Sequence, residues 1–208
     1  NLNMNNVFES FNNFIETSTK EESLQLFLKK HPSILIHTFN QGAHYPTVLP
    51  KFKLSDELIP DFIIIGRRSG TKYTSWDVDM IEIEPSINDR NIFTKKGLSA
   101  GRLRVAEGQI TAWRQWMQSN AQAIFVPKAL KKLKEKNAWD DNPHFYNPSS
   151  FNYQSMMVSY RIVIGRRSDF GDIGDKYRDI KWEESGHRIE IVPWDRLLDK
   201  TRIFILEK

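Results

Sequence analysis

Three acidic residues stand where two neighbouring strands would bring them together. Asp61 opens a β-branched and aromatic stretch that predicts a buried strand over 60–65, and Glu82 and Glu84 end the next predicted strand, 76–84. Side chains two apart on a strand share a face, so Glu82 and Glu84 stand together, and a turn between the strands brings Asp61 close to both. Three crowded carboxylates repel one another unless cations lie between them. Oxygen ligands of this kind suit hard divalent ions such as Mg²⁺.

The alternative is that Glu82 and Glu84 form the solvated face of an edge strand, which is a common pattern. Two details favour a buried site. Met80 and Ile81 make both faces of the strand apolar, as in a central strand, and Pro85 ends the strand directly after the acidic pair. Ligands of open α/β sheets collect near such strand ends.

The elements that would position these residues form one α/β unit. Helical periodicity covers residues 7–15 and about 18–31, and a weakly alternating edge strand is predicted over 47–54. After the two acidic strands come a long helix over 101–120, a short strand over 121–126, a basic helix over 128–136 and a loop over 139–152. The chain then alternates as strand 156–164, helix 172–182, strand 188–192 and a short helix to 198. This order predicts a mixed central sheet flanked by helices. Residues 1–40 form an N-terminal helical cap and 41–208 the main domain.

Composition excludes several classes of function. The 208 residues include no cysteine, which removes disulfides, thiolate metal sites and cysteine nucleophiles. The net charge of +4 permits a polyanionic partner without requiring one. No apolar run is long enough to span a membrane, and the first residues lack the pattern of a signal peptide. The five histidines show no metal-ligand spacing, and there is no Gly-x-Ser-x-Gly motif or phosphate-binding Gly-rich loop.

The acidic motif resembles a known signature. Pro60-Asp61, followed by Glu82-x-Glu84, is similar to the PD-(D/E)XK nuclease motif with Glu in place of Lys, and Gln109 with Trp113 resembles the Gln-x-x-x-Tyr motif of the next helix in many such enzymes. The wider chain resembles the nuclease domain of Shedu anti-phage defence proteins. That resemblance rests on Glu21-x-x-Leu24-Gln25-x-Phe27-Leu28 with His31-Pro32, on Ile162-Val163-Ile164-Gly165-Arg166, and on Ile189-x-Ile191-Val192-Pro193-Trp194-Asp195-Arg196-Leu197-Leu198.

The resemblance implies a restriction-endonuclease-like fold and cleavage or nicking of double-stranded DNA with Mg²⁺ or Mn²⁺. It implies that Asp61, Glu82 and Glu84 bind the metal and that Gln109 holds the water or a carboxylate, although a helix glutamine is equally well a simple surface residue. Glu84 stands in the place of the usual lysine. It either binds a second ion or accepts a proton from water, or else the site is weakened. A cation could instead be supplied from elsewhere in the chain, by Lys72, Lys95 or Lys96.

Further residues have two explanations each. Glu21 reaches the metal site, as an acid from this region often does in nucleases of this type, or it merely belongs to the capping box that starts at Thr19. Basic side chains would follow DNA phosphates or simply be solvated; these are Lys72, Lys95, Lys96, Arg102, Arg104 and Arg114, with the lysines of 128–136. The partners expected are double-stranded DNA and further copies of the chain, in a prokaryotic cytoplasm, with no membrane and no small-molecule cofactor.

Two other functions stay open. The same fold could serve as a non-catalytic nucleic-acid-binding or assembly module, which Glu84 in the lysine position keeps possible. A protein-interaction domain is the third option, and exposed tryptophans would favour it. The six tryptophans and 13 phenylalanines are otherwise expected in the core.

Overall fold

The fold is built on a five-stranded mixed sheet with the order β1-β2-β3-β4-β5. In the computed structural model, which describes residues 2–40, 42–69, 74–87, 91–136 and 151–206, the strands are β1 (His44–Pro50), β2 (Phe62–Ser69), β3 (Thr74–Ile83), β4 (Met156–Val163) and β5 (Ile189–Val192). β1, β2 and β3 pair antiparallel, whereas β3, β4 and β5 pair parallel. The expected mixed α/β architecture is therefore confirmed.

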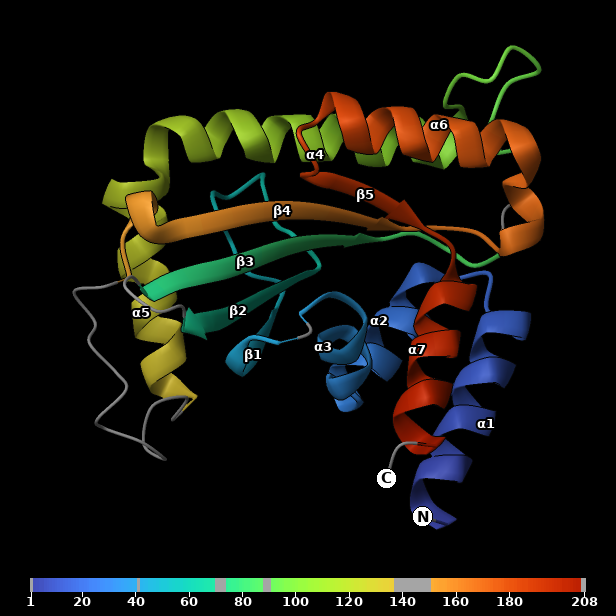
Figure 1. The fold of residues 1–208 in the computed structure, drawn as a ribbon, viewed down its shortest axis with the longest axis horizontal. Helices are drawn as coiled ribbons and strands as arrows, with labels where there is room; N and C mark the ends of the chain where they lie inside the picture. The colour runs from blue at the N-terminus through green and yellow to red at the C-terminus, as the bar shows by residue number, and fades with distance from the viewer. Residues whose placement is uncertain (1, 41, 70–73, 88–90, 137–150, 207–208) are drawn as a thin grey trace.

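Helices lie on both faces of this sheet (Figure 1). One face carries α4 (Gly101–Asn120) and α6 (Gly171–Glu184), and α5 (Val126–Glu135) runs across one end. The other face carries α1 (Leu2–Thr17), α2 (Glu21–Lys30), α3 (Ser33–Phe39) and α7 (Trp194–Leu206). Two short 3₁₀ turns, η3 (Tyr153–Ser155) and η4 (Arg167–Asp169), precede β4 and α6. Because parallel strands need a crossover, α4 and α5 connect β3 to β4, and α6 connects β4 to β5.

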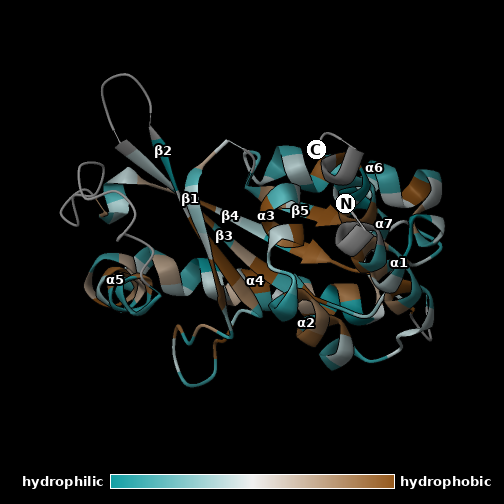
Figure 2. Cartoon of the chain, turned by 90° about the horizontal axis from the view of Figure 1, so that it is seen from below, coloured by the Kyte–Doolittle hydropathy of each residue, from teal (hydrophilic) through white to brown (hydrophobic). Residues whose placement is uncertain are grey.

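Alternation along the strands makes two separate cores, and Figure 2 shows the hydrophobic residues that follow the sheet. On β3, Val78 and Met80 are buried on the face covered by α4, while Ile81 and Ile83 are buried against α1, α2 and α7. A strand buried on both faces is a central strand. The edge-strand explanation of Glu82 and Glu84 is therefore wrong, since β3 lies between β2 and β4.

Two sequence-based expectations are corrected. Residues Ala121–Phe125 form a π-helical turn that continues α4 into α5, not a strand; Ala121 and Phe125 are buried four residues apart, which is helical spacing. The last helix does not end at 198 but runs to Leu206, because α7 packs along α1 and α3 and buries Thr201 as well. The expected limits of the helical cap, 1–40, stay a prediction.

Candidate functional site

Asp61 and Glu82 face each other across two paired strands. Phe62 pairs with Ile81, so the register brings Asp61, one residue earlier, opposite Glu82. The Asp61 carboxylate is 3 % exposed and its Oδ2 accepts a hydrogen bond of 2.8 Å from the Ile83 backbone N–H. This backbone bond fixes the aspartate beside the end of β3, as the sequence predicted.

Glu82 lies on β3 and Glu84 directly after its last residue, Ile83, and each is only 5 % exposed. The backbone of Glu84 is held at both ends: its N–H donates to Val163 O (2.8 Å) and its carbonyl accepts from Trp194 Nε1 (2.8 Å). Its carboxylate contacts Arg102 Nη1 of α4 at 3.3 Å. Glu82, by contrast, has a buried Oε2 with no hydrogen-bond partner among the residues that the structure describes.

Burial and, for the two glutamates, neighbouring carboxylates raise the pKa values of these acids. Burial first, and then repulsion from Asp61, Glu84 and Glu21, raises the pKa of Glu82 to about 9. Burial and Glu21 raise the pKa of Glu84 to about 7, although Arg102 opposes the change. Burial also raises the pKa of Asp61. Glu82 is therefore protonated at neutral pH unless a cation compensates its charge.

Glu21, at the first position of α2, faces this cluster. Its pKa is raised by burial and by Asp61, and its side chain hydrogen-bonds to Gln25 on the next turn. The capping explanation is wrong, since α2 begins after Lys20 and has no side-chain cap. Of the two explanations offered for Glu21, proximity to the acidic site is the one that the structure supports.

Sequence reasoning missed Lys51. Its ammonium group pairs with the Asp61 carboxylate, and its backbone N–H donates to the Asp61 carbonyl at 2.7 Å. Lys51 follows β1 in a left-handed backbone conformation (φ 48°), which turns the chain back toward Asp61. No sequence motif predicts this role, because the Lys51–Asp61 ion pair forms only when β2 pairs antiparallel with β1. Gln25, which faces a pocket of about 350 Å³ with Lys51 and Asp61, was also missed, because it reaches this pocket from α2 and its position depends on how that helix packs.

Gln109 does not join the cluster. It is exposed on α4, seven residues after Arg102, which is about 10 Å further along the helix. None of the contacts of the described residues connects it to Asp61, Glu82 or Glu84. Trp113, the other half of the expected helix motif, is buried in the core.

The predicted DNA-binding residues are scattered. Lys72 lies outside the described residues, while Lys95, Lys96 and Arg104 are exposed. Arg102 contacts Glu84, so it acts on the acidic cluster, and the half-buried Arg114 lies near Tyr160.

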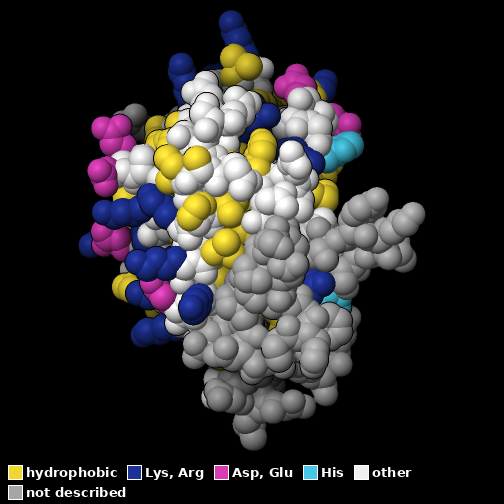
Figure 3. Space-filling model, turned by 90° about the vertical axis from the view of Figure 1, so that its left-hand side faces the viewer, with side chains coloured by type: hydrophobic (Ala, Val, Ile, Leu, Met, Phe, Trp, Pro, Cys, Tyr) yellow, Lys and Arg dark blue, Asp and Glu magenta, His cyan; other side chains and the backbone are white. Residues whose placement is uncertain are grey.

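The lysines of the basic helix form a more continuous surface. Figure 3 views the end of the molecule where α5 lies and shows Lys and Arg side chains along one side, with Asp and Glu side chains between them. The exposed lysines of α5 and its C-cap are Lys128, Lys131, Lys132, Lys134 and Lys136.

The carboxylates of Asp61, Glu82 and Glu84 are suitable ligands for a hard cation, but they are not arranged as a complete coordination site. Among the described residues, no group of three or more acidic or histidine side chains is close enough to hold a metal ion as it stands. The chemistry nevertheless fits: the ligands are carboxylate oxygens, and Glu82 Oε2 is buried without a partner. Binding would require Asp61 and Glu84 to loosen their contacts with Lys51 and Arg102.

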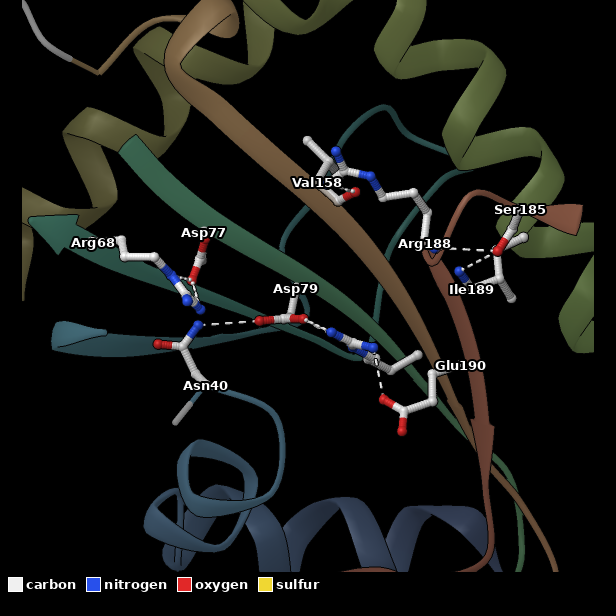
Figure 4. A network of polar contacts seen from close by, with 10 residues as sticks. Asn40, Arg68, Asp77, Asp79, Val158, Ser185, Arg188, Ile189 and Glu190 are labelled. Atoms are coloured by element: carbon white, nitrogen blue, oxygen red, sulfur yellow. Dashed lines mark hydrogen bonds and ion pairs between the residues drawn. The ribbon is translucent and has the colours of Figure 1, made fainter. Parts of the chain in front are cut away.

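A second polar cluster lies on the opposite face of β3 (Figure 4). Asp79 is 3 % exposed; it contacts Arg161 through Nε and Nη2, both at 2.9 Å, and accepts a bond of 3.1 Å from Asn40 Nδ2. Arg161 also contacts Glu190 at 2.7 Å. Asp77, two residues before Asp79, pairs with Arg68 at 2.7 Å. Burial raises the pKa of Asp79, but Arg161 and Asn40 oppose the change, so we interpret this cluster as structural.

The fold and the site define a mixed α/β protein with a buried acidic cluster where its two central antiparallel strands meet. The family model described as "Shedu protein SduA, C-terminal" matches residues 18–198, most of the chain, and the chain belongs to this family. No curated protein matches the sequence significantly. No helix within the described residues is long and apolar enough to cross a membrane.

Proposed function

We propose that this chain is a metal-dependent endonuclease or nickase that hydrolyses phosphodiester bonds of double-stranded DNA in Shedu-type anti-phage defence, on a restriction-endonuclease-like fold. One observation carries the proposal. Glu82 is buried, its Oε2 has no hydrogen-bond partner among the described residues, and burial followed by repulsion from Asp61 and Glu84 raises its pKa to about 9. Perturbed groups of this kind concentrate at functional sites.

Each residue then has a role. Asp61, Glu82 and Glu84 would hold Mg²⁺ or Mn²⁺, which supplies a polarised water and stabilises the charge that develops on the phosphate. Lys51 takes the part of the lysine that Glu84 replaces. Its side chain is 56 % exposed while its ammonium group contacts Asp61, so it can meet an incoming phosphate at the edge of the cluster. Arg102 holds the Glu84 carboxylate in place.

The alternative is a nucleic-acid-binding or oligomerisation module on the same fold. A specific observation favours it: Lys51 and Arg102 already compensate Asp61 and Glu84, as the cations of an inactive site would. The exposed lysines of α5 serve either function, since they give salt-dependent binding to phosphates without sequence recognition.

The test is a supercoiled-plasmid assay with Mg²⁺ or Mn²⁺. We expect Asp61→Asn and Glu82→Gln to lose at least the factor of about 100 that loss of a residue supporting a metal ligand can cost. Asp77→Asn is the matched control, because Asp77 is a buried acid of the same strand on the opposite face. It should keep its activity.

A second readout does not depend on catalysis. Mn²⁺ should raise the melting temperature of the wild-type protein and of Asp77→Asn, but not that of Glu82→Gln, because a ligand that binds only the folded state stabilises it. Nicking that survives in both site variants would place the activity elsewhere. DNA binding without cleavage and without stabilisation by Mn²⁺ would establish the binding module instead.

A further inference from the structure

A pocket of about 320 Å³ lies along the open edge of the sheet, away from the acidic cluster. It is bounded by α6, by the edge strand β5 and by the start of α7, which begins where β5 ends (Figure 1). Its volume is in the range of small-molecule sites. The side chains that matter for its chemistry are three arginines, one tryptophan and two acids: Arg167, Arg178, Arg196, Trp182, Asp179 and Glu190.

The arginines leave donors available to a ligand. Arg178 contacts Asp175 at 3.1 Å and stacks over the Phe170 ring, yet its Nε is buried and has no acceptor among the described residues. This Nε is covered by the protein itself, so the donors that Arg178 can offer to a ligand are those of its terminal nitrogens. Arg196 is exposed, and no ion pair of the described residues includes it. Arg167 is bridged to Asp199 at 2.5 Å but keeps its other donors.

The acids of the pocket do not cancel this charge equally. Glu190 is already compensated by Arg161, whose Nη1 lies 2.7 Å from its Oε2. Asp179 is exposed. Unlike Glu190, Asp179 has no ion-pair partner within the described part of the chain. The pocket combines guanidinium donors for an anion with one free acceptor for a hydroxyl or amino group.

Trp182 adds an aromatic surface. Its indole is half-buried and packs at 5.2 Å, ring centre to ring centre, from the His187 imidazole. Aromatic side chains in such positions stack against the bases of nucleotides. Arginines, an acid and an indole thus line one small pocket.

We infer that this pocket binds a free nucleotide. The guanidinium groups of Arg178, Arg196 and Arg167 would contact its phosphates, since planar guanidinium matches phosphate oxygens in pairs. Asp179 would accept from ribose hydroxyls, as an acidic residue does in dinucleotide sites, and Trp182 would stack on the base. A duplex is too large for the pocket, so a nucleotide fits better than a DNA backbone. The inference is independent of the proposed nuclease activity.

The test is a calorimetric titration of the full chain with ATP, inorganic phosphate and a short DNA duplex, each up to about 1 mM. We expect saturable binding of ATP, weaker binding of phosphate, and quenching of tryptophan fluorescence by ATP that Trp182→Leu abolishes. Arg178→Gln should weaken ATP binding about 10-fold or more, because it removes a charge-assisted contact. Lys176→Gln is the matched control, since Lys176 is an exposed base of α6 that does not line the pocket.

Arg196→Gln provides a second variant if Arg178→Gln fails to fold, because Arg196 is exposed and its loss should not affect folding. It should also weaken ATP binding. Three outcomes would overturn the inference: no saturable binding of ATP, unchanged affinity in both arginine variants, or binding of the duplex that competes fully with ATP. The last would make the arginines part of a nucleic-acid surface. None of these readouts requires nicking, so the two proposals fail separately.

Discussion

Buried acids lie on both faces of β3 and its C-terminal end, and the two pairs differ in the contacts that they make inside the protein. Asp77 and Asp79 each contact an arginine, and Asn40 also donates to Asp79 (Figure 4). On the other face, Glu84 has one long contact to Arg102, and Glu82 has an oxygen without a partner in the described part of the chain. Burial alone therefore does not distinguish a structural acid from a functional one.

The difference lies in where the compensating charge comes from. A buried ion pair is acceptable when its partner and hydrogen bonds come from the same chain, as Arg161 supplies for Asp79. Glu82 instead keeps its proton, because burial and its acidic neighbours raise its pKa to about 9. Because no cation among the described residues pairs with this carboxyl, a proton neutralises it, and an external cation can take the place of that proton.

Disrupting the second polar cluster, around Asp79 and Arg161, should have the largest effect on stability. Arg161→Met leaves Asp79 and Glu190 without their cation, and the loss of one partner of a buried pair costs about 3–5 kcal/mol. We expect a fall of this size in the free energy of unfolding, measured by urea denaturation. Adding Asp79→Asn to this variant should recover part of the loss. A single variant as stable as the wild type would show that this cluster is not structural.

Replacing Glu82 should instead increase the free energy of unfolding. The folded protein holds the Glu82 proton up to about pH 9, whereas an unperturbed glutamate loses it at about 4.5. This contribution to stability is therefore complete below about pH 4.5 and is lost as the pH rises through 9. Glu82→Gln removes the loss, so we expect it to raise the free energy of unfolding by up to about 3 kcal/mol at pH 7, at 1.36 kcal/mol per pKa unit.

Thermal denaturation without divalent metal checks this expectation. The wild type and Glu82→Gln should melt alike near pH 4 and diverge as the pH rises. The groups that set this behaviour are Asp61, Glu84, Glu21 and Lys51, and all of them are retained in the variant. Equal melting temperatures at every pH would mean that Glu82 titrates normally. The acids on the two faces of β3 would then not differ in how their charge is compensated.

The smallest effect is expected at Arg102. Its side chain is 51 % exposed, so its contact with Glu84 contributes less than about 1 kcal/mol to stability. Because Arg102 opposes the rise in the pKa of Glu84, Arg102→Gln should move that pKa above its present value of about 7. Carboxyl NMR titration of Glu84 measures the change. Arg104→Gln, an exposed residue of the same helix, should leave the titration unchanged.

The sequence predicted that Asp61, Glu82 and Glu84 lie together, because their placement depends on local geometry; their catalytic and metal-binding roles stay predictions. Alternation along β3 placed Glu82 and Glu84 on one face, and the strand before it brought Asp61 opposite. The helix motif was less informative: Gln109 is a surface residue of α4 about 10 Å along the helix from Arg102, and the helical period does not tell which turn of a helix meets the site. The π-helical turn at Ala121–Phe125 was taken for a strand because its short apolar run fits either element.

The sequence by itself indicated that Glu82 and Glu84 share a face, since side chains two apart on a strand do so, and that the strand before them begins at Asp61. Only the tertiary structure decided which charges meet them. Lys51, Glu21 and Arg102 reach the cluster from a strand end and two helices, and the acids at 77 and 79 find their arginines across the sheet. Electrostatic compensation acts through space, so it depends on packing between elements that the sequence pattern of a single strand does not contain.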